Sequence, residues 1–301
     1  MDDRIVSLSA FTNILQASID EVLANTSPTE WDENHLSFSI VQRLREVFCN
    51  SSPIQVENGL IGLNAEAYKI TGAIEQTHGD IAIVVHHMFD DRRELRGIGF
   101  YEAKASGAGN NRYPAFNYRQ LRRLVTSTPK LALLLYEQQS SSASSDPFNA
   151  LVKDFRSDWR PKYDEGSRAR TVEANLVVGL KDPNYAAHFY AEPFAFHLVS
   201  RYLSGKDLDY SRPPLESLKR WLKVTKRSAP IIIAVRVIQS DTSSFPELPI
   251  LPPVIELPSG YEMVPYPTSS HSSRFTGDTL ISQLLLPPSD VNDTTEKPKS
   301  D

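Results

Sequence analysis

Two acidic residues and a lysine are the side chains of this sequence that are best placed to do chemistry. Asp80 opens the apolar, β-branched stretch 80–85, which is typical of a buried strand. Glu102 and Lys104 lie in a second expected strand, 99–104, where the period of two places them on one face. If the two strands pair, two carboxylates and an ammonium group converge at one end of a sheet. Such a group could bind Mg²⁺ through hard carboxylate oxygens, polarise a phosphate and activate water.

The combination of Asp80 with Glu102-x-Lys104 resembles the signature of the PD-(D/E)XK, or restriction-endonuclease-like, nuclease superfamily. Gly79 stands at the position of the proline in that signature, and the resemblance covers roughly residues 30–136. The resemblance implies that Asp80 and Glu102 bind Mg²⁺ or Mn²⁺ and that Lys104 orients or activates the attacking water. It also implies hydrolysis of nucleic acid, with DNA as the expected substrate, a 5′-phosphate product and a role in prokaryotic defence or restriction.

Two further residues complete the expected site through the same resemblance. Glu33, near the start of an expected helix 29–49, resembles a glutamate that reaches the metal, and Glu30 is the alternative for this role. Gln120, in an expected helix 117–127, resembles a glutamine that lies near the site. Each residue also has a purely structural explanation. Glu33 suits the positive end of a helix dipole, and Gln120 could lie on a solvated basic helix.

Nucleic-acid binding is expected to depend on local basic clusters. The net charge is −5, and more than half of it lies in residues 261–301, so the rest of the chain is close to neutral. The clusters lie on expected helices at 117–127 and 213–227. They comprise Arg119, Arg122 and Arg123 on the first helix, and Lys219, Arg220 and Lys223 on the second. The stretch 148–170 interleaves basic and aromatic residues, which suits either a nucleic acid or an ordinary protein surface.

The order of the expected elements predicts an α/β fold, in which a mixed central β-sheet is flanked by helices around a restriction-endonuclease-like core. Amphipathic helices are expected at 4–24 and 29–49, followed by a loop at 51–65. Three strands are then expected to form a meander, at 67–74, 80–85 and 99–104. The later elements are helix 117–127, strand 130–136, strand 171–180, helix 193–203, helix 213–227 and strand 231–238.

Two parts of the chain differ in composition. Residues 1–238 are expected to form one nuclease-like domain, and residues 239–301 a Pro/Ser-rich extended segment that is partly disordered. Within that segment, residues 279–286 could form a short apolar helix that contacts the body or a partner protein.

The single cysteine, Cys49, permits no internal disulfide and fits a reducing cytosol. The chain opens without a signal peptide and has no apolar run long enough for a bilayer, so a cytoplasmic location without a membrane partner is expected.

A non-catalytic interpretation competes with the nuclease. Glu-x-Lys occurs on many solvated strands as a simple charge pair, and the same fold could serve as a binding or scaffold module that acts through a protein partner. The two hypotheses differ in metal binding, because only a nuclease needs Mg²⁺ or Mn²⁺ at Asp80 and Glu102. The sequence leaves open DNA versus RNA, the mode of cleavage and whether the chain forms a homodimer.

Overall fold

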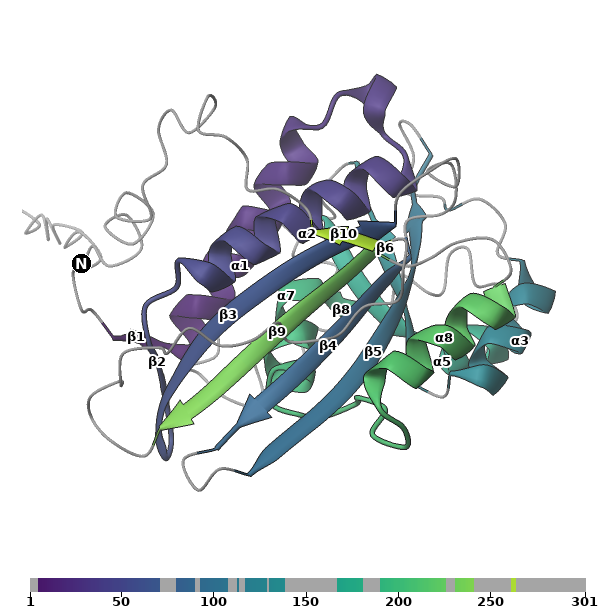
Figure 1. Cartoon of the computed structure of the whole chain (residues 1–301). Coiled ribbons are helices and arrows are strands. Elements are labelled where there is room, and N and C mark those ends of the chain that lie inside the picture. The colour runs from purple at the N-terminus through teal and green to yellow at the C-terminus, as the bar shows by residue number, and fades with distance from the viewer. Residues whose placement is uncertain are drawn as a thin grey trace, which may run out of the picture. The chain divides into compact units, whose positions relative to one another are not determined.

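Figure 1 shows the chain in a computed structural model that describes most of its first 263 residues. The described residues are 5–70, 80–89, 93–107, 113, 117–128, 130–138, 167–180, 190–225, 231–240 and 261–263. All of them belong to one compact unit, Met1–Tyr266, and Pro267–Asp301 forms a second unit. Most of the basic and aromatic stretch 148–170, and the expected short helix at 279–286, lie outside the described residues.

The described residues build a ten-stranded mixed sheet, so the predicted mixed sheet is confirmed. Nine strands follow the order β1-β2-β3-β9-β4-β5-β6-β7-β8, and the last strand, β10, pairs with β3. The strands are β1 (Val6–Ser7), β2 (Ile54–Val56), β3 (Gly59–Ile70), β4 (Ile81–Met88), β5 (Glu94–Ala105), β6 (Leu131–Tyr136), β7 (Ala169–Glu173), β8 (Glu192–Pro193), β9 (Ile231–Ser240) and β10 (Tyr261–Met263). The central strands β4 and β5 are antiparallel, whereas β5 and β6 are parallel.

Helices flank the sheet, as expected for an α/β fold (Figure 1). They are α1 (Leu8–Asn25), η1 (Pro28–Glu30), α2 (Glu33–Cys49), α3 (Tyr118–Ser127), α5 (Ala174–Gly179), α7 (Phe194–His197), the π-helical turn η4 (Leu198–Tyr202) and α8 (Pro214–Thr225). No helix in the described ranges is long and apolar enough to cross a membrane.

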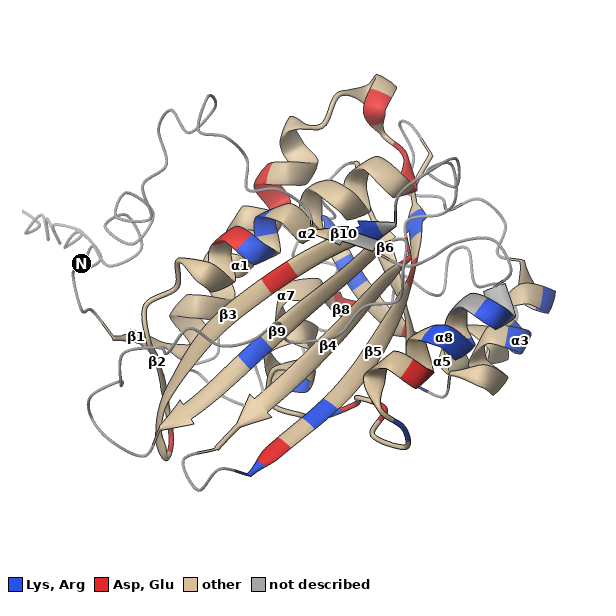
Figure 2. Cartoon of the chain, in the orientation of Figure 1, with Lys and Arg blue, Asp and Glu red and all other residues tan. Residues whose placement is uncertain are grey.

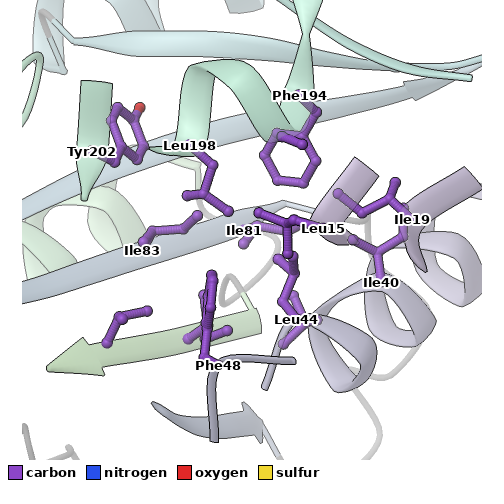
Figure 3. Packing of buried hydrophobic residues seen from close by; sticks show 14 of the residues in the cluster. Leu15, Ile19, Ile40, Leu44, Phe48, Ile81, Ile83, Phe194, Leu198 and Tyr202 are labelled. Atoms are coloured by element: carbon purple, nitrogen blue, oxygen red, sulfur yellow. The ribbon is translucent and has the colours of Figure 1, made fainter. Parts of the chain in front are cut away.

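Two buried clusters divide the core between the faces of the sheet. In β4 the odd-numbered residues, such as Ile81 and Ile83, pack with α1, α2 and α7, and Figure 3 shows this packing. The even-numbered residues Ala82 and Val84 belong to a second cluster with α3, α5 and α8. Because β4 is buried on both faces, its sequence is a continuous apolar run rather than an alternating one. The even-numbered residues of β5, such as Ile98 and Phe100, belong to this second cluster as well. Asp80, Glu102 and Lys104 are also even-numbered, so they lie on the face of the sheet that α3 and α8 cover.

Polar side chains fix the starts of the two helices that carry expected site residues. Asp32 caps α2 by accepting hydrogen bonds from the backbone N–H groups of Asn34 and His35, so the helix begins at Glu33. Asn117 caps α3 by accepting a hydrogen bond from the backbone N–H of Gln120 at 3.1 Å, so the helix begins at Tyr118.

The expected meander of three consecutive strands is wrong. β9 lies between β3 and β4, where it is antiparallel to β3 and parallel to β4. The physical reason is the burial of β4, since a strand that is covered on both faces needs hydrogen-bonding partners on both edges. β5 occupies one edge, and the apolar residues Ile232 to Val235 of β9 fill the other.

Three further predictions from the sequence differ from the structure in single segments of the chain. The loop expected at 51–65 is instead a hairpin of β2 and β3, with Val56 opposite Gly59 across a two-residue turn. Gly59 has a positive φ of 128°, which only glycine adopts readily. The second half of the strand expected at 171–180 is the helix α5, in which the buried residues Ala174 and Val177 follow a helical spacing. The helix expected at 193–203 is divided into α7 and η4.

Candidate active site

The pairing of β4 with β5 determines which acidic residues meet. Ile81 pairs with Tyr101 in the antiparallel register, so the residues one step outward, Asp80 and Glu102, face each other. Both are almost fully buried, with 2% and 4% of their surface exposed. The structure therefore places the two expected carboxylates together at the end of the sheet where β4 begins and β5 finishes.

Lys104 lies beside this pair and links it to a third carboxylate. Its Nζ donates to Glu102 Oε1 at 3.0 Å and to the carbonyl oxygen of Ala103 at 2.8 Å. It also lies 3.5 Å from Glu33 Oε2. Burial alone disfavours a charged ammonium, but Glu102, Glu33 and Asp80 outweigh this effect and raise the pKa of Lys104 above its ordinary value. Lys104 therefore carries a positive charge at neutral pH.

Glu33 connects the start of α2 to the end of β5. Its Oε1 accepts a hydrogen bond from the backbone N–H of Ala105 at 3.3 Å, while its other oxygen approaches Lys104. Glu30, the alternative residue, lies exposed in η1. Of the two glutamates, Glu33 is the one that the structure places at the site, as a partner of Lys104.

Gln120 reaches the same group from α3. Its Nε2 donates to Glu102 Oε1 over a long distance of 3.5 Å. The structure thus brings together all five expected residues, which are Asp80, Glu102, Lys104, Glu33 and Gln120.

The surroundings of Asp80 disfavour the ionised form of its carboxyl group. Burial, followed by the negative charge of Glu102, raises the pKa of Asp80 well above its usual value, and Lys104 only partly opposes this effect. The two carboxyl groups lie within hydrogen-bonding reach, so a protonated Asp80 can donate to Glu102. Once both are ionised, Asp80 Oδ1 and Glu102 Oε2 have no hydrogen-bond donor in the described part of the chain. A proton or a second cation is needed to stabilise this pair.

The donor set suits a hard divalent cation that retains open positions. Mg²⁺ is commonly bound by one or two carboxylates together with water and substrate phosphate, so Asp80 and Glu102 are sufficient in kind and number. Among the described residues, no group of three or more His, Cys, Asp or Glu side chains is arranged to hold a metal ion, so Glu33 does not join Asp80 and Glu102 as the expected third ligand. The oxygens of Glu33 engage Lys104 and the backbone N–H of Ala105 instead.

The expected basic clusters lie on neighbouring helices. α3 packs against α8, and Figure 2 shows lysine and arginine positions, coloured blue, on the ribbons of both helices. All six side chains are exposed, namely Arg119, Arg122 and Arg123 of α3, and Lys219, Arg220 and Lys223 of α8. Because α3 also carries Gln120, this basic surface adjoins the carboxylate pair.

Two residues at the site were not recognised as site residues from the sequence. The indole N–H of Trp31 donates to the carbonyl oxygen of Ser106 at 3.0 Å, just beyond Lys104. Trp31 could be interpreted only as part of an apolar stripe, and Ser106 only as the start of a loop. The sole sequence signal was their position, since each lies two residues from an expected site residue.

Comparisons of the chain with protein-family models, with curated proteins and with solved structures gave no match. A functional conclusion must therefore be drawn from the site itself.

Proposed function

We propose that this chain is a nuclease that hydrolyses phosphodiester bonds of nucleic acid, with DNA as the first candidate, and that it depends on Mg²⁺ or Mn²⁺. The observation that carries the proposal is the buried pair Asp80 and Glu102, which face each other beside the ammonium group of Lys104. An ionised pair of buried carboxylates is costly unless a cation stabilises it, and a metal site for phosphate chemistry supplies that cation.

A restriction-endonuclease-like core is part of the same proposal. Its support is the continuous unit β4-β5-α3-β6, which carries the Asp80, Glu102-x-Lys104 and Gln120 pattern in the expected order. A role in prokaryotic defence and a cytoplasmic location are proposed on the sequence resemblance alone.

Each side chain has a distinct role in the proposed reaction. Asp80 and Glu102 would hold the metal, which, when bound, polarises the phosphate and lowers the pKa of a coordinated water. Lys104 places its positive charge next to the attacked phosphate, where negative charge develops in the transition state. Glu33 and the carbonyl oxygen of Ala103 hold the ammonium group in place. Gln120 orients the carboxylate of Glu102.

The basic surface on α3 and α8 would bind the phosphate backbone of the substrate. We expect that neutralising it weakens binding to all sequences alike and flattens the dependence of log K on log salt. The slope should fall by roughly one for each phosphate contact that is lost. Two triple-Ala variants test this by salt titration, one of Arg119, Arg122 and Arg123, and one of Lys219, Arg220 and Lys223.

The α3 variant should have the larger effect on cleavage, because its helix also carries Gln120. Wild-type salt slopes in both variants would show that nucleic acid is not bound through these helices. Conversely, a changed slope in both variants would indicate one continuous binding surface.

Incubation with plasmid, linear duplex and single-stranded substrates tests the activity directly. Cleavage is expected with Mg²⁺ or Mn²⁺ and none with EDTA, and the products should carry 5′-phosphates. The absence of cleavage on every substrate, together with an unchanged melting temperature when Mg²⁺ is added, would contradict the proposal. That result would favour a scaffold module of the same fold, which acts through a protein partner.

A further inference from the structure

The end of β5, just past Lys104, is held by three hydrogen bonds at Ser106. Its backbone N–H donates to the carbonyl oxygen of Tyr136 at 2.9 Å, and its carbonyl oxygen accepts from the indole N–H of Trp31 at 3.0 Å. Its hydroxyl oxygen accepts from the backbone N–H of Gln138 at 3.3 Å. Ser106 is buried, with 3% of its surface exposed, and each of its three polar groups has a partner.

Trp31 belongs to the chain segment that also delivers Glu33. It directly precedes Asp32, the cap of α2. The segment that opens α2 therefore contacts the last residue of β5 and the residue after it, since Glu33 accepts from the N–H of Ala105 and Trp31 donates to the carbonyl oxygen of Ser106. These two contacts fix the backbone immediately after Lys104.

Lys104 needs such support because its side chain is long and flexible. A lysine loses up to about 2 kcal/mol of rotamer entropy when it is fixed in one geometry. Its ammonium group is held here in a defined place between Glu102 and Glu33. That place depends on the relative position of α2 and the end of β5, and the hydrogen bond from Trp31 to the carbonyl oxygen of Ser106 joins these two segments.

We propose that Trp31 and Ser106 are positioning residues for Lys104, and that together they form a clamp between the start of α2 and the end of β5. The catalytic consequence rests on the proposed nuclease function, whereas the effect on Lys104 itself does not. A displacement of about 1 Å at a reacting group can cost roughly a hundredfold in rate, so a clamp outside the carboxylate group can influence catalysis.

The reactivity of the Lys104 amine tests the clamp without any assay of cleavage. Limiting acetic anhydride is added to the full chain, and the acetylation of each lysine is measured by mass spectrometry. Lys130 serves as the internal reference, because its side chain is 51% exposed and that of Lys104 is 16% exposed. Lys104 should be acetylated about three- to tenfold faster in Trp31→Phe, which loses the indole donor to the Ser106 carbonyl oxygen. The same increase is expected in Ser106→Ala, which loses the hydroxyl that accepts from the backbone N–H of Gln138.

Two further variants separate positioning from general loss of stability. Trp221→Phe is the matched control, because Trp221 is buried and stacks on Phe100 at 4.6 Å, four residues before Lys104 along β5. It should destabilise the protein without increasing the acetylation of Lys104. Ser106→Thr keeps the hydroxyl group and should restore the slow acetylation. Unchanged acetylation in both Trp31→Phe and Ser106→Ala would overturn the clamp.

Kinetics then test whether the clamp acts through Lys104. In the wild-type background, Trp31→Phe should lower kcat by about tenfold with little change in KM. In a Lys104→Ala background the same change should have no further effect, because the group that it positions is absent. Equal losses in the two backgrounds would overturn action through Lys104. Faster acetylation in a chain that cleaves no substrate would support the clamp and refute the nuclease, whereas unchanged acetylation with normal cleavage would do the reverse.

Discussion

Replacing Asp80 by Asn is expected to abolish cleavage of nucleic acid and to raise the melting temperature at neutral pH. The activity should fall by about a thousandfold or more, because a metal ligand is lost and metal-based charge stabilisation is worth several kcal/mol. The stability should rise because Asp80 is buried next to Glu102, and its ionised form is costly in the absence of metal. The Asn amide can also donate to Glu102 Oε2, which has no donor among the described residues.

The sign of the pH dependence follows from the raised pKa of Asp80. The folded state retains the Asp80 proton to a higher pH than the unfolded chain does, so the wild-type protein loses stability as the pH rises above about 4. This loss continues until the folded pKa is passed. Asp80→Asn cannot lose this proton, so its stability should fall less over the same range. At neutral pH and without metal, the variant should therefore melt a few degrees above the wild-type protein.

Binding of Mg²⁺ should make the wild-type protein more stable than Asp80→Asn, the reverse of their order without metal. Mg²⁺ at ten times its dissociation constant stabilises the wild-type protein by about 1.4 kcal/mol, and Asp80→Asn should show no such gain. Asp207→Asn is a suitable control, because Asp207 pairs with Lys130 and Arg201 away from the carboxylate pair. It should retain activity and gain no stability at neutral pH. Cleavage at the wild-type rate by Asp80→Asn would refute the site.

The contacts among Asp80, Glu102 and Lys104 could be predicted from the sequence because they depend on short-range rules. A period of two places Glu102 and Lys104 on one face, and a hairpin between neighbouring strands brings Asp80 opposite Glu102. Glu33 and Gln120 are expected only through the family resemblance, because their contacts with Lys104 and Glu102 join separate elements of the fold.

The remaining parts of the structure depend on contacts between distant segments. β9 enters the sheet between β3 and β4, although about 160 residues separate it from β3, and its apolar run fits either an edge or a central position. The role of Trp31 likewise requires that α2 begin beside the end of β5, a tertiary contact over 75 residues. Asn58-Gly59 is different, because this pair is a hairpin signal that the sequence contained and the loop prediction overlooked.

Replacing Lys104 by Met should lower the rate of the chemical step by roughly a hundredfold to a thousandfold while leaving substrate affinity nearly unchanged. The reason is the position of its ammonium group, which lies against Glu102 within the buried site rather than on the exposed basic surface of α3 and α8. Single-turnover cleavage with Mg²⁺ measures the rate, and binding in EDTA measures the affinity. A large loss of affinity with a normal cleavage step would show that Lys104 is only a phosphate contact.

The same substitution should also change stability in the direction opposite to that of Asp80→Asn. Removing the ammonium group leaves Glu102 Oε1 with only the long contact to Gln120, and it leaves Glu33 without its counter-charge. We expect a loss of about 1 to 3 kcal/mol at neutral pH, the typical cost of a buried polar group that loses its partner. This loss should diminish on addition of Mg²⁺, which supplies the missing positive charge. A variant that is equally destabilised with and without Mg²⁺ would show that Lys104 contributes by packing alone.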